Sequence, residues 1–120
     1  VDVAGIDSTT ASHIHEGAAG VIGGVIVTLF AGPSACLSTA VPPVPINVAS
    51  PRCRAGFTGP LNQAQVKYSA LTALPAGYGA TARERFDSLL VLLRTGGVYV
   101  NVHNPANLGG HVRGQTQPRP

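Results

Sequence analysis

Glycine and proline interrupt this sequence so often that only short secondary-structure elements can form between them. The 120 residues include 15 glycines and 10 prolines, and the longest apolar stretches are Val25–Phe30, which Thr28 interrupts, and Leu89–Leu93. A membrane-spanning helix requires about 20 consecutive apolar residues, so neither stretch is long enough. Because glycine and proline favour turns, we expect short strands joined by turns.

The composition is typical of one folded domain. Hydrophobic residues make up 44% of the chain and charged residues 11%, which is too apolar for a disordered segment. A chain of this length has room for a single core. The net charge is +3, but the cations are dispersed and aromatic residues are not interleaved with them, unlike a nucleic-acid-binding surface. Because the chain begins with Val1-Asp2 and no initiator methionine, we expect a processed or incomplete chain.

The two cysteines, Cys36 and Cys53, are separated by 16 residues and lack the spacing of a zinc finger or a redox motif. We therefore predict a disulfide between them, which would stabilise the fold by about 3 kcal/mol and implies an oxidising compartment. Six prolines lie between Ala31 and Pro60, and each removes a backbone donor that a central strand needs. We expect residues 31–60 to form a long loop that is pinned by this disulfide.

Hydrophobic periodicity predicts one helix, over residues 82–95. Thr81 and Glu84 have the spacing of a capping box, and the leucines that follow recur on one helical face. Gly96-Gly97 can end the helix in a left-handed conformation. This is the only segment for which a helix is the sole prediction, because residues 62–74 fit a strand or a short helix equally well.

Short strands are predicted at residues 12–14, 21–30, 98–103 and 111–115, with a bend at Gly23-Gly24 and turns at 104–105 and 109–110. The strand at 98–103 alternates with period two. We therefore expect Val98, Val100 and Val102 to face the core, and Tyr99, Asn101 and His103 to face the other way.

Three segments, in this order, together resemble the chordin-type (CHRD) domain family. They are Ala11–Gly20, which contains His13-Ile14-His15, the leucine-rich helix that ends at Gly-Gly, and Tyr99–Pro105 running into Gly109–Gln115. The resemblance covers the first 30 residues and roughly residues 86–115. It implies a single domain over residues 1–120, folded as a mainly β, antiparallel β-sandwich of the immunoglobulin-like or superoxide-dismutase-like kind with one short α-helix. It also implies a secreted, extracellular or periplasmic location, and it names no reaction.

The sequence departs from the family pattern in two places. Family domains usually have two or more strands before the His-x-His segment, whereas only Val1–Asp7 precede it here. The sandwich would then lack N-terminal strands, and a neighbouring chain could donate one at the open sheet edge. His111 stands where the family more often has an acidic residue, which adds a candidate metal ligand.

All four histidines lie within these motifs: His13, His15, His103 and His111. Residues i and i+2 of a strand share a face, with Cα atoms roughly 6.5 to 7 Å apart, so His13 and His15 could bind one ion. His103 and His111 could complete a copper or zinc site if their strands are neighbours. The alternative is structural: the histidines hydrogen-bond backbone carbonyls at strand ends. The sequence leaves both interpretations open.

The sequence offers no convincing enzyme active site. Ser12 and His13 are adjacent, so their side chains point to opposite faces of a strand. The five acidic residues do not form a hydrolase pair; Glu16 is expected in solvent, and Arg113 is expected to bridge to Asn101 or to a carbonyl. We therefore expect a structural or protein-interaction module that self-assembles by strand complementation. The alternative function is copper or zinc binding, with superoxide-dismutase-like chemistry as its extension.

Overall fold

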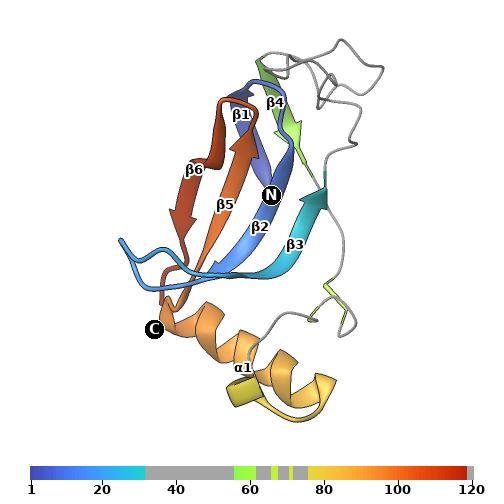
Figure 1. Ribbon diagram of the computed structural model, residues 1–120, viewed down its shortest axis with the longest axis vertical. Coiled ribbons are helices and arrows are strands. Elements are labelled where there is room, and N and C mark those ends of the chain that lie inside the picture. Colours follow the sequence, from blue (N-terminus) through green and yellow to red (C-terminus); the bar gives the residue numbers. More distant parts are fainter. Residues whose placement is uncertain (32–55, 62–65, 68–70, 72–75, 119–120) are drawn as a thin grey trace. The chain divides into compact units, whose positions relative to one another are not determined.

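A computed structural model gives the fold (Figure 1). The part of the chain that it describes contains six strands, one α-helix and one 3-10 helix. The structure describes residues 1–31, 56–61, 66–67, 71 and 76–118. In chain order the elements are β1 (Asp2–Ile6), β2 (Ala11–Glu16), β3 (Val25–Ala31), β4 (Phe57–Pro60), η4 (Ala76–Tyr78), α1 (Ala82–Thr95), β5 (Val98–Asn104) and β6 (Asn107–Gln115). Within these residues, no helix has the length and apolar character that crossing a membrane requires.

The strands form two antiparallel sheets. One has two strands, β1 and β4, and the other has four strands in the order β3-β2-β5-β6 (Figure 1). In the smaller sheet Val3 lies opposite Gly59 and Ile6 lies opposite Phe57, with an irregularity between these two pairs. Gly5 lies in that irregular stretch and has a φ of 63°, a conformation that favours glycine.

The chain divides into two compact units. The first unit comprises Val1–Ser12, Leu29–Ala64 and Val102–Val112, and the second comprises His13–Thr28, Gln65–Asn101 and Arg113–Pro120. Each strand of the larger sheet contributes residues to both units.

The core of the first unit joins its two sheets. Ile6 of β1, Leu61 and Val102 of β5 are buried together. Four partly buried apolar residues pack against them: Val1, Val3, Phe30 and Phe57. Because this cluster draws on the small sheet and on β3 and β5 of the larger one, the apolar faces of two sheets cover each other. The predicted antiparallel β-sandwich with one α-helix is confirmed.

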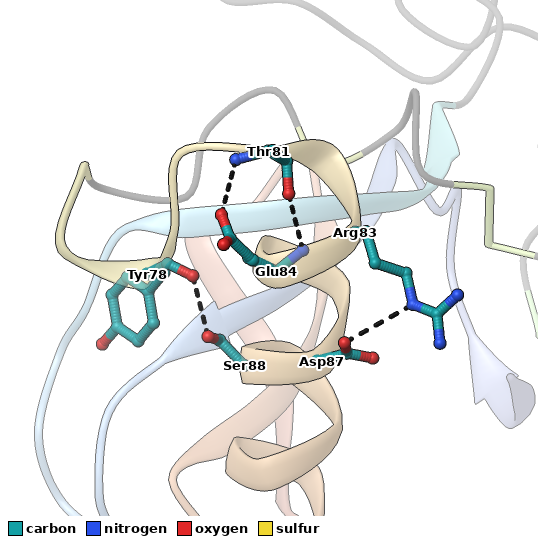
Figure 2. Close-up of polar contacts among 6 residues, drawn as sticks. All are labelled: Tyr78, Thr81, Arg83, Glu84, Asp87 and Ser88. Carbon is teal, nitrogen blue, oxygen red and sulfur yellow. Dashed lines mark hydrogen bonds and ion pairs between the residues drawn. The ribbon is translucent and has the colours of Figure 1, made fainter.

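The second unit contains the helix, which begins and ends where the sequence predicts. The Thr81 hydroxyl accepts from the Glu84 backbone N–H at 3.2 Å, and the Glu84 carboxylate accepts from the Thr81 N–H at 2.9 Å (Figure 2). Gly96 ends the helix with a φ of 75°. The Ser88 hydroxyl donates to the Tyr78 carbonyl at 2.8 Å, which joins the helix to η4 (Figure 2).

Two strands were not predicted. β1 forms from the residues before the His-x-His segment, so one strand does precede β2. Its partner β4 lies at the end of residues 31–60, for which we expected a loop throughout. The prolines of that segment do not prevent β4, because the only one it contains, Pro60, is its last residue, where a missing backbone donor is tolerated.

Two boundaries were also wrong. Residues 21–24 are not part of a strand, and β3 begins at Val25. Gly109 and Gly110 lie inside β6 rather than in a turn, and the chain reverses at Pro105 and Ala106. Paired glycines were interpreted as turn residues, but a strand tolerates them where its ladder is irregular, and Gly110 has a φ of 121°. Cys36, Cys53 and most of residues 62–74 lie outside the described residues.

Candidate functional site

The two histidines of β2 lie close together. The ring centroids of His13 and His15 are 5.7 Å apart with an edge-on interplanar angle of 74°. Their potential metal-binding atoms lie within 4.8 Å of each other. The i, i+2 spacing therefore brings the two imidazoles to one face of the strand, as predicted.

The side chains of His15 and Arg113 both lie against the ring of Tyr99, a residue of β5. The His15 ring stacks on it, with centroids 5.0 Å apart and an interplanar angle of 14°. The guanidinium carbon of Arg113 lies 3.4 Å from the Tyr99 ring centroid, which is a cation–π contact. Tyr99 is only 2% exposed, and Asn101 on the same strand face is 5% exposed. The face of β5 that carries Tyr99 and Asn101 is therefore buried. The alternation predicted the core on the other face, which carries the valines.

Arg113 and Gln115 hold the loop that joins β2 to β3, residues 17–24. Arg113 donates to the carbonyls of Val21 and Ala18, at 2.7 and 2.8 Å. The Gln115 amide nitrogen lies 2.9 Å from the Gly17 carbonyl and donates to it. The predicted bridge from Arg113 to a backbone carbonyl is present, but its acceptors lie in this loop.

The loop is also tied to the histidine and tyrosine. The Gly23 N–H donates to the Tyr99 hydroxyl at 3.2 Å, and Nδ1 of His15 donates to the Gly23 carbonyl at 2.9 Å. Only glycine fits at position 23, because a Cβ there would overlap the Glu16 carbonyl. The loop thereby holds Val21 and Ile22 outward, 53% and 91% exposed.

Glu16 ends β2 and is not simply solvated, contrary to our expectation. Its carboxylate accepts a hydrogen bond from the hydroxyl of Tyr78 in η4. Sequence reasoning missed this partner because 62 positions separate the two residues. It also gave no role to Gln115, although the Arg-Gly-Gln sequence at the end of the last motif could have drawn attention to it.

The hydrogen bonds of His15 and His103 define the same tautomer. A backbone carbonyl can only accept, so Nδ1 of His15 carries the proton that Gly23 accepts. Nδ1 of His103 likewise donates to the Leu108 carbonyl at 2.9 Å. In the neutral form, Nε2 of each ring then has the lone pair that a metal ion needs. The predicted structural role, a hydrogen bond to a backbone carbonyl, is present at both residues.

His111 has the opposite arrangement. The Asn107 amide nitrogen lies 2.9 Å from Nδ1 of His111 and 3.0 Å from the Asn104 side-chain oxygen, and it donates to both. Nδ1 of a neutral His111 is therefore an acceptor, and the ring proton is on Nε2. The Nδ1 hydrogen bonds of these histidines thus differ: His15 and His103 donate to backbone carbonyls, and His111 accepts from Asn107.

Ser12 of β2, which carries the hydroxyl next to His13, is not accessible to solvent. A substrate could not reach it without opening the strand.

The model of one protein family, the CHRD domain, matches residues 1–116. The chain belongs to the CHRD domain family. The match spans the proline-rich segment, which the motifs alone did not align. No curated protein and no solved structure matches this CHRD domain chain.

Proposed function

We propose that this CHRD domain is an extracellular structural or protein-interaction module, and that it self-assembles by adding a strand of a second copy to β3. Membership of the CHRD family supports the extracellular interaction role. The observation that carries the self-assembly is the composition of β3, an edge strand of the four-stranded sheet.

The sequence of β3 lacks the residue types by which proteins often protect a sheet edge. Its sequence, Val-Ile-Val-Thr-Leu-Phe-Ala, contains no charge, proline or glycine, and no charged residue occurs between Gly17 and Ala31. Native edges are usually blunted by lysine, proline or bulges, because every second residue of an edge strand turns its backbone groups away from the sheet. A strand of β-branched and aromatic residues without charge is the kind that pairs with another strand.

The other edge is blunted. β6 contains Arg113 and His111 and three glycines, of which Gly110 has a φ of 121°. Side chains of β6 also hold neighbouring segments, as Arg113 does for the loop before β3. Strand addition is therefore favoured at β3.

A second copy of the chain fits β3. An antiparallel pair centred on Thr28 places Thr28 opposite its own copy, Val27 opposite Leu29 and Ile26 opposite Phe30. Such aromatic–aliphatic and Thr–Thr pairs contribute roughly 0.2–1 kcal/mol each. No like charges meet in this pairing, because the strand has none.

The test is sedimentation velocity at increasing protein concentration. The wild-type chain is expected to form dimers. Thr28→Lys places two lysines opposite each other and is expected to give monomers, as is Thr28→Glu, whereas an equimolar mixture of the two variants is expected to dimerise. Val112→Lys, at the exposed Val112 on β6, is the matched control and is expected to dimerise like the wild type. The assignment is refuted if the wild type is monomeric at all concentrations. It is also refuted if Val112→Lys abolishes dimers and Thr28→Lys does not.

The extracellular location predicts that Cys36 and Cys53 form a disulfide. Intact-mass spectrometry after alkylation, with and without prior reduction, measures this. Alkylation of both thiols in the unreduced native protein would argue against an oxidising compartment.

A further inference from the structure

The His13–His15 pair has the geometry of a chelate and goes beyond the proposed interaction role. Two imidazoles project from one face of β2, with potential ligand atoms no more than 4.8 Å apart. Two nitrogens bound to one tetrahedral zinc ion, each at about 2.0–2.1 Å, lie about 3.3 Å apart. Only a small adjustment of the side chains would bring both to one ion.

The surroundings of His15 prepare it for such a role. Its Nδ1 is fixed by the Gly23 carbonyl, and Tyr99 both stacks on its ring and accepts from the Gly23 N–H. Metal-bound histidines almost always donate their other ring nitrogen to a carbonyl or carboxylate, which fixes the tautomer and the ring orientation. His15 has this arrangement: a backbone carbonyl, that of Gly23, accepts from Nδ1.

We propose that His13 and His15 bind one divalent transition-metal ion, Cu²⁺ or Zn²⁺, with Nε2 of His15 as one ligand atom. Imidazole nitrogens suit both ions. His103 has the same Nδ1–carbonyl hydrogen bond, but it belongs to the other compact unit, and the proposed site consists of His13 and His15 alone. His111 is left out of the site because Nδ1 accepts from Asn107.

The ion would also act on the loop at residues 17–24. Gly23 of that loop accepts from the same imidazole that binds the metal. A bound ion polarises the ring and strengthens this hydrogen bond. Metal binding is therefore expected to slow amide exchange in the loop that displays Val21 and Ile22.

Isothermal titration of the native chain with ZnSO4 and, separately, with CuSO4 tests the proposal. One ion is expected to bind each chain. His13→Ala is expected to weaken binding by more than about tenfold, equivalent to about 1.4 kcal/mol. His13→Gln provides a second variant of similar volume, and His111→Ala is the matched control, with unchanged affinity expected. Thermal unfolding of each variant, measured without metal, establishes that it is folded.

Electron paramagnetic resonance of the Cu²⁺-loaded protein provides an independent readout. Nitrogen hyperfine splitting is expected in the wild type and in His111→Ala, and a reduced number of coupled nitrogens is expected in His13→Ala. The proposal is overturned if neither ion binds stoichiometrically, or if folded His13→Ala and His13→Gln bind as tightly as the wild type. Equal losses of affinity in His111→Ala and His13→Ala would also overturn it.

Discussion

Replacing Arg113 should release the loop at residues 17–24 without unfolding the protein. The guanidinium donates to the carbonyls of Val21 and Ala18 and stacks on Tyr99. A hydrogen bond to a charged group contributes about 1.5–3 kcal/mol, and an exposed cation–π contact about 0.5–1 kcal/mol. Because the Arg113 side chain is exposed and water can replace it at both carbonyls, we take roughly 2–3 kcal/mol for the set.

Amide hydrogen exchange measures this loss directly. The Val21 N–H donates to the Ala18 carbonyl at 3.0 Å, and the Gly23 N–H donates to the Tyr99 hydroxyl. If both amides exchange by opening of the loop, 2–3 kcal/mol corresponds to exchange that is about 30 to 150 times faster in Arg113→Ala. Arg113→Lys is expected to show an intermediate rate, because one ammonium group cannot reproduce the fork of a guanidinium.

The control is Arg94→Ala, which removes an exposed arginine from the last turn of α1. It should leave exchange at Val21 and Gly23 unchanged. The reasoning is refuted if Arg113→Ala protects these amides as well as the wild type does. It is also refuted if Arg113→Lys behaves like the wild type, since the two-carbonyl geometry would then contribute nothing.

Leu89→Ala, at a side chain only 2% exposed on α1, should lower the free energy of unfolding by about 2–5 kcal/mol, whereas Val91→Ala, 57% exposed on the same helix, should change it by about 0.5 kcal/mol or less. Equal effects in chemical denaturation would contradict the assigned core face. Backbone and side-chain hydrogen bonds with Thr81 hold the pKa of Glu84 below its usual value, so its contribution to stability is present above the unfolded-state pKa and is lost as the pH falls through the folded-state pKa. Thermal melts between neutral and acidic pH should therefore show a smaller loss of Tm in Glu84→Gln than in the wild type; parallel curves would contradict this. Gly23→Ala should accelerate amide exchange throughout residues 17–24, because its Cβ would overlap a backbone carbonyl, and normal protection there would show that the loop has another closed form.

The helix could be predicted because its signals are local. The Thr81–Glu84 capping box, the leucine periodicity and Gly96 act within a few residues of chain, and α1 spans Ala82–Thr95 as expected. The His13–His15 pair was equally accessible, because side chains two apart in a strand share a face wherever that strand lies.

Strand partners were harder to predict than strands. β1 and β4 are five and four residues long and pair across more than 50 positions of sequence. Neither has a local signal as strong as a capping box, and each is stabilised by the core that Ile6, Leu61 and Val102 form together. Such a core exists only after distant segments meet.

By itself the sequence determined the fold class, the family motifs, the helix and the placement of two imidazoles on one strand face, because each depends on residues close together in the chain. Only the tertiary structure decided that Arg113 and Gln115 hold the loop before β3, since 92 and 98 positions separate them from the carbonyls of Val21 and Gly17. It also decided whether Nδ1 donates or accepts at His15, His103 and His111. A tautomer is set by the partner at the other ring nitrogen, and those partners are carbonyls and an amide that the fold brings to each ring.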